Sequence, residues 1–244
     1  MNVERNLPVV RERKLAILKG DPELCAQQQK AGKLLARERI ALLLDAASFV
    51  ELDVLNSDAG VVTGYGLVNG SPVYVYAQDF TVNGGSVGAA HARKVLKVMD
   101  MAEKTGAPVI AILDTAGARL DEGIDAMNAY AQMAGRVSAL SGVVPQISLV
   151  LGQCGGIASA IAGMSDITIM SKNGALFVNG PQVVSAVSGK EVTMENIEAF
   201  AQKVLEDINP RDSWRASKAL RQHVAEESAK RCIIESVKRA GGEL

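Results

Sequence analysis

The chain has 244 residues, a formal net charge of −1, and a composition that is 48% apolar but only 4% aromatic. This length allows one large domain or two small ones with an aliphatic, alanine-rich core, and the near-neutral charge argues against a nucleic-acid partner, which normally requires a basic surplus. Cys25, Cys154 and Cys232 are far apart and form no CxxC pair, so we expect no disulfide framework, no zinc ribbon and a cytoplasmic location.

Residues 1–49 are predicted to form a polar, helical N-terminal arm. Charged side chains occupy the first turns in place of an apolar segment, so we expect no signal peptide. Farther along, Asp21 and Pro22 have the residue types of an N-cap and a first helical position.

Residues 50–193 have the pattern of an α/β core. Extended structure begins at "SFVELDVL", and "GVVTGYGLVNGSPVYVYAQDF" predicts two strands joined by a tight turn at Asn69-Gly70. Helices are then predicted after Gly84-Gly85, from the end of "TAGARLDEG" through about Leu140, and from Gly155 to about Met164. They alternate with the buried strands "PVIAILD" and "PQISLVLG". The short strands "SDITIM" and "GALFVNG" follow. This alternation predicts repeated β-β-α units and a largely parallel sheet.

Two other segments bear on membrane insertion and on assembly. No charge occurs between Arg136 and Asp166, a distance sufficient for a membrane span. The break at "GQCGG" divides this run into a buried strand and a buried helix, so we expect no membrane insertion. Residues 194–244 are predicted to be amphipathic helices broken at Asn209-Pro210 and ending at Gly241-Gly242. Both this segment and residues 1–48 are candidate interface elements, and solvated helices are the plainer alternative.

Side chains suited to catalysis are scarce. The only histidines are His91 and His223, there is no GxSxG motif, and no histidine or carboxylate spacing suits a metal. Cys154 lies at a strand end, where a nucleophile could act, but a packing role is favoured because only a helix N-terminus would lower its pKa. His91 is expected to be structural. "GQCGGIASAIAG" also departs from the dinucleotide-binding pattern G-x-G-x-x-G.

Backbone chemistry remains. "GQCGG", "FTVNGGSVG" and "TAGARLDEG" each follow a predicted strand and lead into a helix, so all three should lie at the carboxyl edge of the sheet. Amide N–H groups in such turns can hold an anion or an oxyanion that forms during a reaction. From the pattern alone, glycines that merely permit tight packing are an equally good explanation.

These residues resemble one family. "GKLLARERIALLLDAASFVELD", "QDFTVNGGSVGAAHARKV", "DTAGARLDEGIDA", "SGVVPQISLVLGQCGG" and "FVNGPQVVSAVSGKEVT" occur in the order seen in carboxyltransferase subunits of biotin-dependent acyl-CoA carboxylases, of the propionyl-CoA carboxylase β type. The resemblance covers about residues 30–195. It implies a crotonase-like (ClpP-like) α/β spiral with flanking helical arms, in the N-terminal half only. The second half, which receives biotin, is expected on a partner chain unless this chain is an isolated domain.

The resemblance also implies roles for individual residues. The amides of Gly156 and Ile157 would hold the thioester enolate, with Gly155 standing where the family usually has alanine and the Ile157 side chain narrowing the acyl pocket. Residues implied to bind substrate are Gly84, Gly85, Ser86, Gly88, Arg93, Lys94, Gly117, Ala118, Arg119 and Gly155. Solvated helix charges are the alternative for Arg93 and Lys94. For Arg119 the alternative is pairing with Asp121 or Glu122 to shape the loop.

The implied reaction transfers a carboxyl group between carboxybiotin and an acyl-CoA. Its substrate is a coenzyme A thioester, its cofactor is biotin on a biotin carboxyl carrier protein, and its further partner is a subunit supplying the C-terminal half, in a hetero- or homo-oligomer. Two alternatives stay open: a component of a biotin-dependent decarboxylase, and a non-catalytic acyl-CoA-binding assembly subunit. The second alternative gains weight because, after Thr193, "MENIEAFAQKVLED" replaces the Gly-Gly and histidine segment expected of the family.

Overall fold

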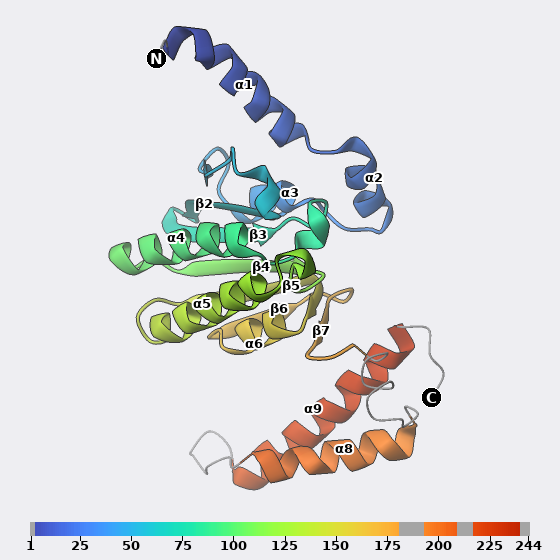
Figure 1. Ribbon diagram of the computed structural model, residues 1–244. Helices are drawn as coiled ribbons and strands as arrows, with labels where there is room; N and C mark the ends of the chain where they lie inside the picture. Colours follow the sequence, from blue (N-terminus) through green and yellow to red (C-terminus); the bar gives the residue numbers. More distant parts are fainter. Residues whose placement is uncertain (1–2, 181–192, 209–216, 240–244) are drawn as a thin grey trace. The chain divides into compact units, whose positions relative to one another are not determined.

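The structure is a computed structural model that describes residues 3–180, 193–208 and 217–239 (Figure 1). Its contacts divide the chain into two units, Met1–Val178 and Asn179–Leu244. In chain order the first unit contains α1 (Val3–Lys19), α2 (Pro22–Lys30), α3 (Ala36–Leu43), β1 (Val50–Leu52), η1 (Ser57–Ala59), β2 (Val61–Val68), β3 (Ser71–Gln78), η2 (Asn83–Gly85), α4 (Ala89–Thr105), β4 (Val109–Thr115), η3 (Leu120–Glu122), α5 (Ile124–Leu140), β5 (Gln146–Gly155), α6 (Ile157–Gly163), β6 (Ile167–Met170) and β7 (Ala175–Phe177).

The strands form one mixed sheet in the order β1-β2-β3-β4-β5-β6, with β7 also paired to β5. β1, β2 and β3 are antiparallel neighbours, whereas β3, β4, β5 and the two last strands are parallel. Helices connect the parallel strands, as parallel crossovers require. The predicted α/β class and the largely parallel sheet are therefore confirmed.

The predicted turn between β2 and β3 is confirmed at Asn69-Gly70. Both residues have positive φ, 50° and 76°, which is the conformation of a two-residue hairpin turn whose twist matches that of the strands. The carboxylate of Asp45, just after α3, accepts the N–H groups of Asn69 (3.0 Å) and Gly70 (2.8 Å). The N-terminal segment thus contributes directly to the start of the sheet.

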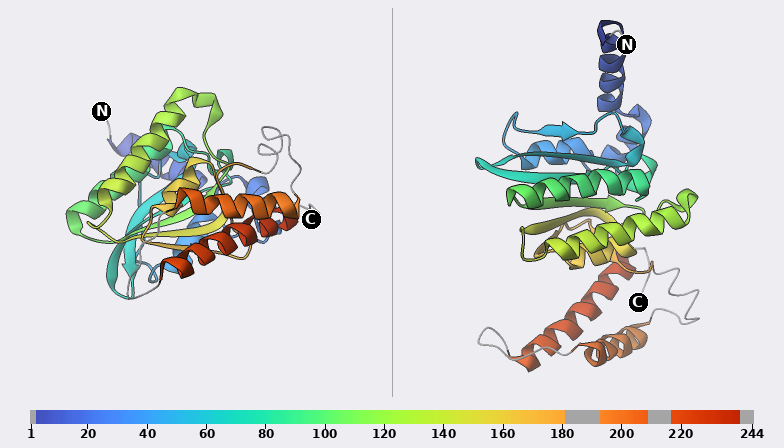
Figure 2. Two further views of the ribbon diagram at one scale, coloured as in Figure 1. Left: turned by 90° about the horizontal axis from the view of Figure 1, so that it is seen from below. Right: turned by 60° about the vertical axis from the view of Figure 1, so that its left-hand side comes forward.

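The sheet has a hydrophobic cluster on each face. Successive residues of β3 alternate between them, because side chains of a strand point to opposite faces: Tyr74 and Tyr76 belong to the cluster with α4, α5 and α6, and Val73 and Val75 to the cluster with α3. Figure 2 shows α4 and α5 running along the sheet as one layer. Although α3 lies in the arm expected at residues 1–49, it packs on the core as the cover of the second face.

The second unit contains α8 (Met194–Asp207) and α9 (Lys218–Arg239), which pack on each other. Thr193 caps α8 by accepting the Asn196 N–H, and Lys230 of α9 pairs with Glu198 of α8 at 2.6 Å. These helices confirm the helical reading of the C-terminal segment. The expected break at Asn209-Pro210 and the expected end at Gly241-Gly242 lie outside the described residues. Among the helices that the structure describes, none combines the length and apolarity needed to span a bilayer.

Packing of α3 on the sheet generates a stability prediction. Ile40 is fully buried, whereas Leu42 on the same helix is 76% exposed. We expect Ile40→Ala to lower the free energy of unfolding by about 2–5 kcal/mol through lost burial and a residual cavity. Leu42→Ala should change it by less than about 0.5 kcal/mol. Urea unfolding of both variants measures the difference, and equal effects would contradict the proposed packing.

Candidate functional site

The glycine-rich loops after β3 and β4 join into one backbone platform. The Val87 N–H donates to Gly117 O, and the Arg119 N–H donates to Val87 O, both at 2.9 Å. The Ala116 N–H adds a bond to Gly84 O at 2.8 Å. Because β3, β4 and β5 are parallel neighbours, the turn after β5 lies at the same edge of the sheet. The predicted grouping of the three loops at the carboxyl ends of the strands is confirmed.

Arg119 holds the platform together. Its Nε donates to Ser86 Oγ (3.3 Å), its Nη2 to Ser86 O (3.2 Å) and its Nη1 to Glu122 Oε1 (3.4 Å). The residue is only 9% exposed. Of the two roles expected for Arg119, these bonds match the loop-shaping one, through Glu122 rather than Asp121.

The carboxylate of Glu122, a residue of η3, lies at the N-terminus of α4. Its Oε2 accepts the Ala89 N–H at 2.6 Å, and Gly88 lies so close to the carboxylate that a Cβ there would overlap it. An anion at a helix N-terminus is electrostatically favourable, and here the chain supplies that anion itself. The loop of Gly84, Gly85 and Ser86 therefore has a defined shape, while its contact with coenzyme A stays a prediction.

The two cations after this loop differ. Lys94 is buried and its Nζ donates to Val61 O at 2.8 Å, and burial lowers the pKa of the ammonium group. The expectation that Lys94 contacts phosphate is wrong, because the residue lies on the face of α4 that packs on the sheet. Arg93 on the adjacent position is exposed, and its contact with phosphate or adenine stays a prediction.

The turn after β5 differs from expectation at its first donor. Gly156 has φ 66° and ψ −137°, a conformation that side-chain-bearing residues rarely adopt. Its N–H is shared between the carbonyls of Phe177 (3.0 Å) and Val178 (3.1 Å). The role of Gly156 as an oxyanion donor is therefore corrected: β7 returns beside the end of β5 and accepts this amide. The Phe177 ring also lies against Gly155, where a Cβ would clash with it.

The amides of Ala118 and Ile157 are among those of the site that have no acceptor among the residues that the structure describes. Ile157 begins α6, so its N–H has no partner within the helix. Ala118 forms a parallel bridge with Val87 that uses the neighbouring amides and leaves its own N–H on the other side. Thr115 pairs with Cys154 in the β4–β5 ladder, and each free amide follows its member of that pair by three residues.

The expected packing roles of Cys154 and His91 are consistent with the structure. Both residues are 0% exposed. Burial raises the pKa of the Cys154 thiol to about 12, so a thiolate nucleophile is disfavoured. His91 Nδ1 donates to Ala59 O at 3.0 Å, and burial lowers its pKa to about 3. In the described ranges, no three His, Cys, Asp or Glu side chains are grouped as a metal would require.

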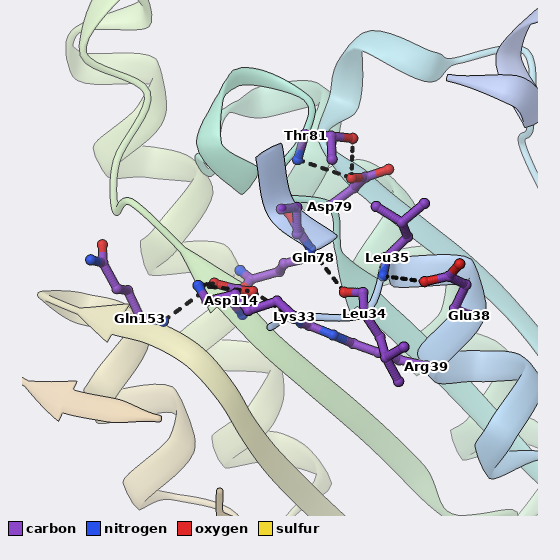
Figure 3. Close-up of polar contacts among 11 residues, drawn as sticks. Lys33, Leu34, Leu35, Glu38, Arg39, Gln78, Asp79, Thr81, Asp114 and Gln153 are labelled. Atoms are coloured by element: carbon purple, nitrogen blue, oxygen red, sulfur yellow. Dashed lines mark hydrogen bonds and ion pairs between the residues drawn. The ribbon is translucent and has the colours of Figure 1, made fainter. Parts of the chain in front are cut away.

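One cluster escaped the sequence analysis. The Asp114 carboxylate, at the end of β4, forms ion pairs with Arg39 (2.8 Å) and Lys33 (3.1 Å) and has no solvent exposure (Figure 3). A single acidic residue ending an apolar strand, with basic residues about 80 positions upstream, carries no pattern that predicts contact. Only the folded chain brings them together.

Comparison with known proteins gives consistent matches. The carboxyl transferase domain model matches residues 27–207. The propionyl-CoA carboxylase beta chain of human mitochondria is 44% identical over 209 residues, covering 79% of this chain and 39% of its own. The methylmalonyl-CoA decarboxylase subunit alpha of Propionigenium modestum is 44% identical over 187 residues, covering 70% and 36%. The chain thus spans about two fifths of the length of these curated relatives.

Solved structures agree. A transcarboxylase 12S structure, a hexamer with hydrolysed methylmalonyl-coenzyme A bound, superposes with a TM-score of 0.73 at 37% identity, covering 82% of this chain and 44% of that one. A Pseudomonas malonate decarboxylase hetero-dimer gives 0.59 at 30% identity, covering 65% and 71%. The crotonase-like fold expected from the resemblance is confirmed.

Burial of His91 gives a pH prediction. The pKa of His91 is about 3 in the folded chain and about 6.5 in the unfolded chain. Because the unfolded chain binds the proton first, the free energy of unfolding falls as the pH drops below 6.5. His91→Asn, whose amide can donate to Ala59 O, removes this dependence. Between pH 7 and 5 we expect wild type to lose about 2 kcal/mol more free energy of unfolding than the variant. Parallel denaturation curves at the two pH values measure this, and identical losses would contradict it.

Proposed function

Because the chain belongs to the carboxyl transferase domain family, we propose that it is the acyl-CoA-binding component of a biotin-dependent carboxyltransferase. The observation that carries the proposal is that the amides of Ala118 and Ile157, just beyond adjacent parallel strands, have no acceptor within the described part of the chain. Ligands normally bind at this edge of an α/β sheet. The donor pair revises our expectation of Gly156 and Ile157, because Gly156 bonds to β7.

The proposed task of this chain is to stabilise negative charge on a thioester oxygen. Removing a proton from the carbon next to the thioester moves charge onto that oxygen, and fixed N–H donors lower the energy of the enolate more than that of the ground state. No side chain of the chain is required as the base. This accounts for a site built from Gly, Ala and Ile, in which Cys154 is buried and His91 is hydrogen-bonded to Ala59 O.

Biotin enters the proposal only through a partner. When bound as carboxybiotin, it supplies the carboxyl group and the basic atom. We assign none of the described residues to holding it, because the free amides suit an oxygen anion and the resemblance places the biotin site in the other half. The chain's own contribution is to bind the CoA thioester on the loops of Gly84–Gly88 and Gly117–Arg119, with Arg93 as the candidate phosphate contact.

Direction is a separate question. The similarity to a methylmalonyl-CoA decarboxylase subunit is as strong as that to propionyl-CoA carboxylase, and the same enolate forms in both directions. We therefore keep a biotin-dependent decarboxylase component as the second candidate. A non-catalytic acyl-CoA-binding assembly subunit is the third.

We further propose that the chain works in a hetero- or homo-oligomer with a C-terminal-half subunit and a biotin carboxyl carrier protein. Apolar side chains at the loop edge support this, because such exposure is typical of interaction surfaces: Leu120 is 89% and Ile124 is 80% exposed. The free thiols of Cys25 and Cys154 are compatible with the cytoplasmic location that we propose.

The amide of Ile157 can be removed selectively. Proline is tolerated at the first position of a helix and lacks the N–H, so Ile157→Pro deletes the donor while changing little else. We expect it to reduce carboxyl transfer about a hundredfold, the usual cost of losing one oxyanion donor. The measurement is transfer from malonyl-CoA or methylmalonyl-CoA to biotin by the chain combined with a candidate second-half subunit.

Ile157→Ala is the matched control, because it shortens the side chain and keeps the amide. A change smaller than about threefold is expected there, well below the loss of a donor. Equal losses in both variants would show that the side chain, not the amide, matters. Binding of CoA thioesters without turnover in every pairing would favour the assembly subunit.

A further inference from the structure

The β4–β5 ladder contains an irregularity beside the site. Pairing runs in register from Val109↔Gln146 to Leu113↔Val150 and resumes at Thr115↔Cys154. One residue of β4, Asp114, therefore faces three residues of β5, namely 151–153. Such a bulge bends the strand, and bulges are frequent next to active sites, where they redirect the following residues.

The side chain of Asp114 fills this bulge. Its Oδ1 accepts the Gln153 N–H at 3.2 Å, while the Asp114 N–H donates to the Gln78 side chain at 3.0 Å. Gly152 leaves the necessary room, since a Cβ there would overlap the carboxylate. The carboxylate thus takes the place of an ordinary ladder partner for the Gln153 N–H of β5.

The charge of this carboxylate is balanced by the segment that precedes the sheet. Arg39 of α3 (2.8 Å) and Lys33 (3.1 Å) both bond to it, from the side opposite Gln153 in Figure 3. Arg39 and Asp114 have side chains that are 3% and 0% exposed. A carboxylate without water requires such partners, and removing one leaves an uncompensated buried charge. The Lys33 segment is itself anchored, because Gln28 Nε2 donates to Leu34 O at 2.8 Å.

The bulge is also where β5 changes partner. Before it, β5 pairs with β6, from Ile147↔Ile167 to Val150↔Met170. From Gln153, the last residue of the bulge, β5 pairs with β7, and this pairing runs from Gln153↔Ala175 to Gly155↔Phe177. The redirected end leads straight into Gly156, whose N–H bonds to β7, and then into Ile157.

We propose that Asp114, with Arg39 and Lys33 bound to it, is a positioning residue that sets the direction of the Ile157 amide by holding the β5 bulge. Segment 33–39 therefore contributes to the site. Its docking on the sheet is coupled to the shape of the turn after β5, which contains Gly156 and Ile157. The catalytic consequence rests on the function proposed above. The structural consequence, a turn that loosens when the ion pair is broken, does not.

The structural consequence is tested by amide hydrogen exchange of the full chain. In Arg39→Met we expect peptides covering 150–158, which contain the bonded amides of Gln153 and Gly156, to exchange at least tenfold faster. Peptides covering 109–113 of β4 should be unchanged. Arg37→Met is the matched control, because Arg37 lies in the same segment but pairs with Glu51 (2.8 Å), and no change is expected at 150–158. Unchanged exchange of 150–158 in Arg39→Met would overturn the proposal.

If Arg39→Met exchanges globally, Lys33→Met decides, because Lys33 is 21% exposed and its loss is less disruptive. It should accelerate exchange of 150–158 at least threefold, and an unchanged rate there overturns the proposal.

The catalytic consequence is tested by kinetics. Whichever of Arg39→Met and Lys33→Met stays folded should show kcat reduced at least tenfold, because the Ile157 amide is misdirected. KM for the acyl-CoA should stay within twofold of wild type, because the loops of Gly84–Gly88 and Gly117–Arg119 are intact. For position 39, Arg39→Lys should restore at least half of kcat. A rise in KM with unchanged kcat overturns the positioning role. Absence of transfer by the wild-type chain in every pairing refutes the proposed function, and the exchange experiment still decides this inference.

Discussion

The organisation of the site depends on one buried charge. Asp114 follows the apolar residues Val109–Leu113 of β4, and burial of a carboxylate is tolerated only with charged and hydrogen-bonding partners. Arg39 and Lys33 supply the charges, and the Gln153 N–H supplies a hydrogen bond. These contacts join the N-terminal segment to the sheet at the bulge of β5, where the strand's pairing with β6 gives way to pairing with β7.

The remainder of the site is backbone held by short-range polar contacts. Arg119 and Glu122 tie the loops after β3 and β4 into one platform, and Gly156 ties the turn after β5 to β7. Amides in such a framework need no reorganisation when charge develops nearby, which is the property that makes preorganised donors effective. The enolate that we propose is common to carboxylation and decarboxylation, which is consistent with similarity to enzymes of both kinds.

Much of the fold could be read from local patterns. Continuous apolar runs predicted β4 and β5, the helical spacing after Gly88 predicted α4, and Asn69-Gly70 predicted the hairpin, because each signal is carried by residues close in sequence. The glycine-rich motifs also located all three loops of the site. By contrast, the phosphate contact expected of Lys94 was wrong, since its neighbour Arg93 carries the same charge and only the rotation of α4 distinguishes a buried face from an exposed one.

Strand and helix positions, the α/β class and the family were thus contained in the order of the residues. Which amides are free was decided only by the folded chain. The Gly156 N–H bonds to the carbonyls of Phe177 and Val178, about twenty residues onward. Asp114 forms ion pairs with Lys33 and Arg39, about 80 residues upstream. Hydrogen bonds and ion pairs between distant segments depend on where the sheet places its ends, and no local pattern of residue types records that placement.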